Sequence, residues 1–409
     1  MNIFNKISFI LVTYFIVLNF STFYALPPAK SGDSIGNRVP ISGDIQQLKY
    51  FFDALEKTNS EKIRIAHYGD SIIWGDIISD NLRVNLQKKY GGHGIGFLSI
   101  CNDDLAARKT IMHEFSDDWD WASVFTKNRD KYPIGIAGTV AKASANSWVS
   151  FATNRVSPAT DSFSEMSLFY SNSNSNSSVK YKINGDEAIT VNLENSKNLT
   201  KTDVNFGKEV NKIKLTFNNS AEAFFYGITL ESGNGIYVDN FPFRGNSGVS
   251  MRDLDEDLLP IFTNNLNYKL VILQFGVNIA ASGNIKYKWY SNMMLNVLQK
   301  IKKSFPNSSI LMISPGDLGQ KQGRKIITHP EIEKFVKVQE EIANEGGVAF
   351  WNMFEAMGGE NSIANWVETT PPLAFKDYCH LTGEGGEIIS MKLITALMEA
   401  KSKIKWLFS

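Results

Sequence analysis

Two different periods of apolar residues divide this chain of 409 residues, and they constrain its fold more than any other feature. Residues 62–67, 268–275 and 309–314 are short apolar runs, and a segment with helical spacing follows each of them. Strands of a parallel sheet have this composition because helices cover both of its faces. The two ends of the chain therefore predict an α/β domain with a buried parallel sheet.

The remaining elements of this domain follow from the same spacing. Helices are expected at 45–55, 76–90, 289–305, 331–344 and 385–398, and a further strand at 348–354. Gly91-Gly92 and Pro306 directly follow two of these helices, and both residue types end helices.

The middle of the chain has a period of two instead. Val179–Ile183 and Lys212–Phe217 alternate apolar and polar side chains, as half-buried strands do. Asn184-Gly185 suits a tight hairpin. We therefore expect a β-sandwich over residues 104–237, inserted into an α/β domain that is formed jointly by residues 26–103 and 238–409.

The first 25 residues differ from the rest. Lys6 precedes an almost wholly apolar run, Ile7–Val17, and Ala25 offers a small residue for cleavage. This pattern predicts a signal peptide at residues 1–25 and a protein that is periplasmic or secreted, with no stable membrane insertion after cleavage. An uncleaved anchor is the alternative, although the run is shorter than the roughly 20 residues that span a bilayer.

The charged residues balance, with 42 Lys plus Arg and 42 Asp plus Glu. A formal net charge of zero gives no reason to expect nucleic acid or an anionic membrane as a partner. Cys101 and Cys379 leave two alternatives, one disulfide or two free thiols. Neither cysteine has a metal-ligand spacing and the five histidines are scattered, so the sequence does not favour a zinc site.

Ser71 is the candidate nucleophile. Gly69-Asp70-Ser71 follows the strand at 62–67 and precedes a helical segment. Such a turn exposes its side chains at the carboxyl edge of a parallel sheet, and the helix N-terminus supplies N–H groups to a developing negative charge. A plain turn with a helix cap is the structural alternative.

Asp377 and His380 stand three residues apart, just before the last expected helix. The Asp carboxylate can accept the Nδ1 proton of the imidazole, which leaves Nε2 to take the proton of Ser71. The pair therefore predicts a general base and the group that orients it. A capping Asp beside an incidental His is the alternative.

Two further positions predict oxyanion donors. Asn278 follows the strand at 268–275, so its side-chain N–H lies at the same sheet edge as Ser71. A glycine in Gly245-Asn-Ser-Gly248 can bring its backbone N–H close to a ligand. We choose Gly248 and keep Gly245 as the alternative.

Together these fragments resemble the GDSL-type esterases called SGNH hydrolases. The matching segments are Gly69-Asp70-Ser71, Gly276-Val277-Asn278 and Asp377–Thr382. The resemblance implies a flavodoxin-like three-layer sandwich and an acyl-enzyme mechanism that needs no metal or cofactor. Ile279 stands where many members have Asp, but that Asp is not one of the four residues that name the family.

A narrower resemblance links His67–Asp76, Tyr90–Phe97 and Tyr226–Glu231 to bacterial peptidoglycan O-acetylesterases. That group carries a β-rich, carbohydrate-module-like domain between the first two motifs. The resemblance implies an exported esterase that removes O-acetyl groups from a cell-wall polysaccharide, with acetylated peptidoglycan as its partner. Two alternatives remain, a polysaccharide O-acetyltransferase with the same site and a non-catalytic glycan-binding protein.

Several aromatic residues invite a role with sugars. Trp74, Trp119 and Trp121 are candidates for stacking on sugar rings, although tryptophan is more often a core residue. His93, in a glycine-rich turn, is expected to be structural, and no role is assigned to His67.

Overall fold

The computed structural model describes residues 36–127, 132–283 and 285–407. The expected signal peptide, residues 1–25, lies outside this range. Among the helices of the described residues, none combines the length and the apolar composition needed to cross a bilayer.

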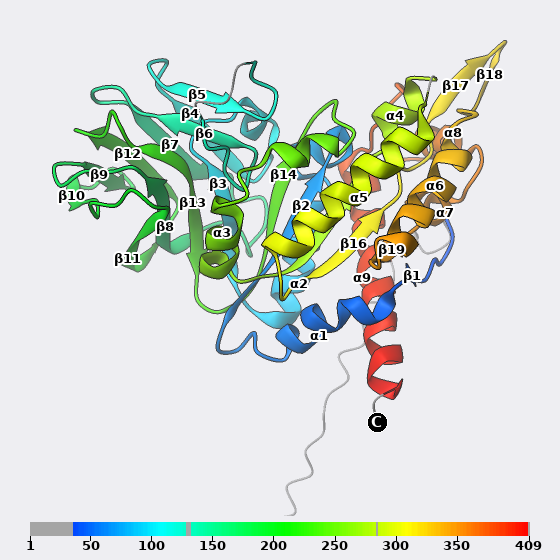
Figure 1. The fold of residues 1–409 in the computed structure, drawn as a ribbon, viewed down its shortest axis with the longest axis horizontal. Coiled ribbons are helices and arrows are strands. Elements are labelled where there is room, and N and C mark those ends of the chain that lie inside the picture. Colours follow the sequence, from blue (N-terminus) through cyan, green and yellow to red (C-terminus); the bar gives the residue numbers. More distant parts are fainter. Residues whose placement is uncertain (1–35, 128–131, 284, 408–409) are drawn as a thin grey trace, which may run out of the picture. The chain divides into compact units, whose positions relative to one another are not determined.

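The main sheet runs through the centre of the α/β region (Figure 1). In spatial order its strands are β1 (Ser42–Gly43), β19 (Ala349–Trp351), β16 (Ser309–Ile313), β15 (Tyr268–Gln274), β2 (Lys62–Gly69) and β14 (Gly235–Pro242). All neighbouring pairs are parallel except β1 with β19. The parallel strands thus have the order 2-1-3-4-5 along the chain, which is the flavodoxin-like order.

Helices cover this sheet on both faces (Figure 1). One face carries α1 (Lys49–Leu55), α2 (Ser79–Tyr90) and α9 (Gly383–Leu407), and the other carries α3 (Leu258–Leu266), α5 (Tyr287–Ser304) and α6 (Ile332–Glu345). In α5 the buried residues Tyr290, Met294, Val297 and Ile301 recur every three or four positions, so one stripe faces the sheet. The predicted mixed α/β fold is confirmed.

Some boundaries differ from the expected ones. The helix expected from residue 76 begins at Ser79, because Asp76 has a positive φ of 67° that no helix continues through. The strand expected over 348–354 ends at Trp351, since α7 (Met353–Met357) begins there. The short helices α4 (Val277–Ala281) and α8 (Ser362–Glu368) and the hairpin of β17 and β18 were not expected.

The middle of the chain forms two antiparallel sheets. One contains β10 (Ile189–Asn192), β9 (Ser178–Ile183), β12 (Lys212–Asn218), β7 (Trp148–Thr153) and β4 (Ile111–Phe115). The other contains β11 (Thr200–Val210), β8 (Phe163–Ser171), β13 (Phe224–Ser232), β6 (Thr139–Lys142) and β5 (Asp120–Ser123), and β3 (His93–Ser99) also pairs with β13. Apolar residues of both sheets form one buried cluster of their own.

His93 corrects one expectation, since it lies in strand β3 and not in a turn. Its Nε2 is 3.0 Å from Ser162 Oγ, so its structural role stands. Glycines hid this strand in the sequence, because Gly94 and Gly96 interrupt the apolar pattern that would have marked it.

A buried ion network joins β2 of the main sheet to β13 of the neighbouring sheet. Arg64 binds Glu231 and lies 3.4 Å from Asp239, and all three side chains are almost completely buried. Lys62 reaches Glu231 at 2.9 Å. Burial by itself would raise the pKa of Glu231, but the two cations lower it below its ordinary value. Glu231 therefore stays ionised, and its ion pairs with Arg64 and Lys62 connect the two sheets.

Removing one charge from this network is expected to destabilise the protein strongly. Glu231→Gln leaves Arg64 buried with half of its compensation, a change that typically costs about 3 kcal/mol. As a control, Asp186→Asn removes the exposed pair with Lys208, which is worth less than about 1 kcal/mol. Urea unfolding of both variants measures the difference. Equal losses of unfolding free energy would show that the buried network does not join the sheets.

Candidate active site

The structure brings Ser71, His380 and Asp377 into one hydrogen-bonded chain. Ser71 Oγ lies 2.9 Å from His380 Nε2, and His380 Nδ1 lies 2.8 Å from Asp377 Oδ2. The other oxygen of Asp377 accepts the backbone N–H of His380 at 3.1 Å, which holds the short turn between the two residues closed. This is the geometry that a base and its orienting carboxylate need for activating a serine.

The position of Ser71 follows from the order of the strands. It comes directly after β2, and Asn278 follows β15, the parallel neighbour of β2. Between these two strands the chain changes direction in the sheet, and α/β folds open their ligand crevice at such a point. Gly69 is required there, because a Cβ would approach the carbonyl oxygen of Gln274 to 2.8 Å.

Asp70, next to the candidate nucleophile Ser71, joins the two strand ends through hydrogen bonds. Its Oδ1 accepts the N–H of Ile72 at 3.0 Å, and its Oδ2 accepts the N–H of Gly276 at 3.1 Å. Burial raises the pKa of this carboxyl to about 6, against the lowering effect of the hydrogen bonds. Sequence analysis missed this role. The acidic residue in front of Ser71 was the available signal, but only the fold reveals its second partner.

Asn278 points its amide at the loop that follows β14. Its Nδ2 donates to the carbonyl oxygen of Asn246 at 3.1 Å. A carbonyl only accepts, so the NH₂ end of the amide must lie on this side. That group has two hydrogens, and the second remains for a ligand. The partner, Asn246, was not singled out in the sequence.

Gly248 lies in the same loop and is buried, whereas Gly245 is exposed. The N–H of Gly248 donates to Asn246 Oδ1 at 2.8 Å. An oxyanion would therefore have to share or replace this acceptor at Gly248. Ser71, as the first residue of the short helix η3 (Ser71–Asp76), provides a further N–H at the start of a helical turn.

The nearby histidine and the two cysteines are not part of the hydrogen-bonded chain at Ser71. His67 is completely buried between Gln274 Oε1 at 2.9 Å and Ser79 Oγ at 2.8 Å, and burial lowers its pKa to about 4. It is neutral and structural. Cys101 and Cys379 are free thiols, which resolves the alternative left open by the sequence. Burial raises the pKa of Cys379 to about 12, so its thiol stays protonated beside His380.

The tryptophans that were candidates for sugar stacking are already packed against other side chains. Trp119 is buried, with its ring edge-on to Phe217 at 4.9 Å, and Trp121 packs against the same cluster. Trp74 lies near Ser71, but the guanidinium of Arg244 stands 4.2 Å from its ring centre. The stacking role therefore receives no support from the placement of these rings.

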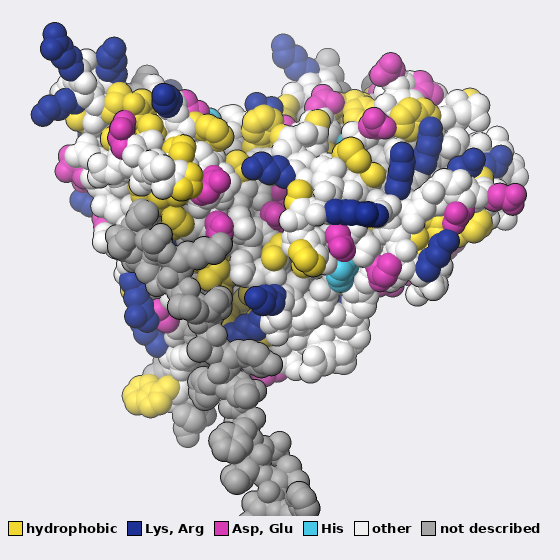
Figure 2. All heavy atoms as spheres, turned by 180° about the vertical axis from the view of Figure 1, so that it is seen from behind, with side chains coloured by type: hydrophobic (Ala, Val, Ile, Leu, Met, Phe, Trp, Pro, Cys, Tyr) yellow, Lys and Arg dark blue, Asp and Glu magenta, His cyan; other side chains and the backbone are white. Residues whose placement is uncertain are grey.

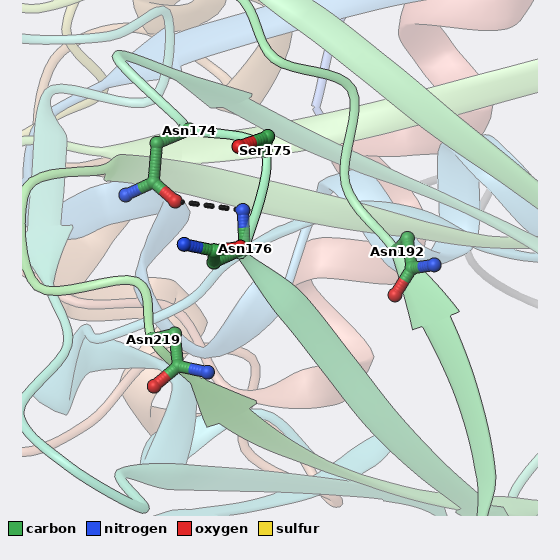
Figure 3. Close-up of a pocket in the computed structure, with 5 residues that line it drawn as sticks. All are labelled: Asn174, Ser175, Asn176, Asn192 and Asn219. Atoms are coloured by element: carbon green, nitrogen blue, oxygen red, sulfur yellow. Dashed lines mark hydrogen bonds between the residues drawn. The ribbon is translucent and has the colours of Figure 1, made fainter.

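A separate hollow of about 480 Å³ opens at one end of the five-stranded sheet (Figure 3). Four asparagines and one serine line it, and Asn174 Oδ1 accepts the N–H of Asn176 at 2.9 Å. Amide side chains neither titrate in the neutral range nor attack esters. No acid or base lines the hollow to activate Ser175, so Ser71 is the better candidate for a nucleophile.

Comparison with known proteins bears on the fold. No family model and no curated protein sequence matches the chain. A solved peptidoglycan O-acetylesterase overlays with a TM-score of 0.71 and 21% identity, covering 90% of this chain and 100% of the other. The acetyl xylan esterase AlAXEase has a TM-score of 0.31 and 18% identity over 39% of this chain and 81% of its own.

A family two carbohydrate esterase from Cellvibrio japonicus has a TM-score of 0.29 and 9% identity, covering 72% of this chain and 98% of its own. The scores of these last two overlays are too low to carry an argument. The likeness to the peptidoglycan O-acetylesterase establishes the fold, and it confirms the mixed α/β fold that the sequence predicted.

The bridging role of Asp70 predicts an unusual acid limb in the pH profile of esterase activity. The ionised carboxylate accepts both N–H groups, so its protonation near pH 6 weakens the bond that holds Gly276. In Asp70→Asn, the side-chain oxygen can accept only one of the two backbone N–H groups, and the other meets the NH₂ group of the amide. This loss of one hydrogen bond is expected to lower kcat by about 10-fold at neutral pH. The measurement is log kcat against pH for an aryl acetate.

The wild type should lose kcat as the pH falls through about 6, in a step that the variant lacks because an amide at position 70 does not titrate. Thermal unfolding of both proteins is measured at each pH, and kcat is compared only where both are folded. Limbs of equal slope and equal midpoint would contradict a bridging role for the carboxylate.

Proposed function

We propose that this protein is an exported serine esterase that removes O-acetyl groups from a cell-wall polysaccharide, with peptidoglycan as its substrate. The observation that carries the proposal is the hydrogen-bonded chain from Ser71 through His380 to Asp377, at 2.9 and 2.8 Å. Its place at the crevice of an SGNH-type fold supports the assignment. Export rests on the sequence of residues 1–25.

The proposed reaction has two halves. His380 Nε2 takes the proton of Ser71 Oγ while Oγ bonds to the acetyl carbonyl carbon. The same imidazole then gives the proton to the sugar oxygen, and the bond between that oxygen and the carbonyl carbon breaks. Water then gives a proton to His380 Nε2 while its oxygen bonds to the carbonyl carbon of the acetyl-serine. The bond from that carbon to Ser71 Oγ breaks, Oγ takes the proton back from His380, and acetate leaves. Asp377 keeps the imidazole in the required tautomer and stabilises its charged form.

The negative charge of each tetrahedral intermediate needs donors. The second hydrogen of Asn278 Nδ2 and the N–H of Ser71 are available for it. In our proposal the N–H of Gly248 joins them and exchanges its bond to Asn246 for one to the oxyanion. No step needs a metal or a cofactor.

The inserted region is proposed to shape the substrate cleft. We assign residues 104–237 to a carbohydrate-module-like β-sandwich and residues 26–103 with 238–409 to the hydrolase domain. Phe125, 52% exposed, packs edge-on against Phe243 at 6.3 Å between ring centres. Phe243 in turn donates its N–H to the Gly69 carbonyl at 2.7 Å, so this aromatic contact is one of several links between the insertion and the strand that precedes Ser71.

Ser71→Ala is expected to abolish acetate release from O-acetylated peptidoglycan, with a loss of at least about 10³-fold in kcat. Acetylated xylan, assayed in parallel, tests the choice of polysaccharide. Ser60→Ala serves as the control, since Ser60 is exposed in the turn before β2, at the opposite end of that strand. Activity of Ser71→Ala at the wild-type rate would refute the esterase, and preference for xylan would refute the substrate.

Asn278→Ala removes one oxyanion donor. It is expected to lower kcat by about 10²–10³-fold and to leave KM for a small aryl acetate nearly unchanged, because the charge exists only in the transition state. Asn265→Ala, which removes an exposed amide on α3, is the matched control. A variant with unchanged kcat would exclude Asn278 from the oxyanion site.

A further inference from the structure

A short hairpin beside the catalytic turn carries an unbalanced positive charge. It consists of β17 (Gly319–Gln322) and β18 (Lys325–Thr328). Lys321, Arg324 and Lys325 are all exposed, and no acidic residue occurs between residues 319 and 330. Within the described part of the chain, none of the three cations forms an ion pair.

The hairpin stands out from the α/β region. Figure 1 shows it extending past the ends of the neighbouring helices, and Figure 2, from behind, shows Lys and Arg side chains gathered at that corner. Because the whole chain has a formal net charge of zero, this cluster is a local feature. Three uncompensated cations attract an anion over about 8–10 Å at moderate ionic strength.

The base of the hairpin is attached to the catalytic turn. Gly319 donates its N–H to the carbonyl oxygen of Tyr378 at 2.8 Å, and Tyr378 lies between Asp377 and His380. A Cβ on Gly319 would stand only 2.6 Å from that of Tyr378, so the backbones are in close contact. Lys376 adds one more exposed cation in the same turn. A chain held by the hairpin therefore passes next to His380.

The surface chemistry favours a hydrophilic polyanion over a lipid bilayer. Elements that bind membranes present exposed apolar side chains together with cations. Here the apolar residues of the hairpin, Ile326 and Ile327, are partly buried, and its tip carries only Gln, Lys, Arg and Gly. The same tip offers long, exposed cations that suit carboxylate groups spaced along a polymer.

We propose that the hairpin of β17 and β18 binds carboxylate groups of an anionic glycan whose acetylated sugar occupies the site at Ser71. The inference rests on the proposed esterase function and narrows its substrate class from acetylated glycans in general to those that carry carboxylates. The hairpin binds remote parts of the substrate equally in ground and transition states. It therefore affects KM for the polymer and leaves kcat unchanged.

The kinetic experiment compares the wild type with a triple variant, Lys321→Gln, Arg324→Gln and Lys325→Gln. Its substrates are soluble O-acetylated peptidoglycan strands with free carboxylates, the same strands after amidation of their carboxylates, and an aryl acetate. The variant is expected to raise KM for the free-carboxylate strands by about 10-fold at low salt, and by less than about 2-fold in 0.5 M salt. The other two substrates should be unaffected.

A matched variant, Lys57→Gln, Lys88→Gln and Lys337→Gln, removes three exposed cations elsewhere, and within the described residues none of their side chains is engaged in an ion pair. It changes the net charge equally and should behave as the wild type. An equal rise in KM for this variant, or for amidated strands in the hairpin variant, would overturn the proposal.

A binding assay separates the hairpin from the reaction. Native electrophoresis of Ser71→Ala through gels that contain polygalacturonate or dextran should show retardation by polygalacturonate alone, and the hairpin substitutions should abolish it. Absence of retardation overturns the proposal even if the esterase is active. Retardation without acetate release from any glycan refutes the proposed function and leaves the anion site standing. If the hairpin cations bind anionic vesicles and the protein does not bind polygalacturonate, the glycan proposal is overturned in favour of a membrane.

Discussion

The parallel pairing of β2 with β15 is the constraint on which the site depends. It places Gly69 opposite Gln274, so the turns that carry Ser71 and Asn278 begin at the same level of the sheet. The buried carboxylate of Asp70 then joins the two turns through the N–H of Gly276. Gly276 has a φ of 140°, and a Cβ there would meet Phe335 at 2.6 Å, so this junction accepts glycine alone.

The α/β fold could be predicted because its signals are local. Apolar runs and helical stripes identify the strands and helices whatever their partners are, and parallel order follows from their alternation. The two antiparallel sheets were foreseen for the same reason, since period two appears within single strands. The hairpin of β17 and β18 escaped prediction because polar residues fill it, and β3 escaped because glycines interrupt it.

Residues of the candidate site divide in a similar way. Ser71, His380 and Asp377 belong to short motifs, so their types and spacing were enough to propose them. Asn246 and the second partner of Asp70 depend on contacts between segments distant in sequence, and no local pattern encodes such contacts. Gly248 is only partly predictable. The motif suggests that its N–H binds an oxyanion, but in the structure this N–H donates to Asn246 Oδ1.

The positions of the charged residues in this protein matter more than its net charge. The composition balances to zero, yet the cations at Arg64 and at the hairpin have opposite roles. Arg64 is buried against two carboxylates, where low dielectric makes pairing obligatory and the ions serve to connect two sheets. The hairpin cations are exposed to solvent and form no ion pair within the described residues, so they can attract an anionic partner. Net charge excludes a global electrostatic role, and only the fold can reveal a local one beside His380.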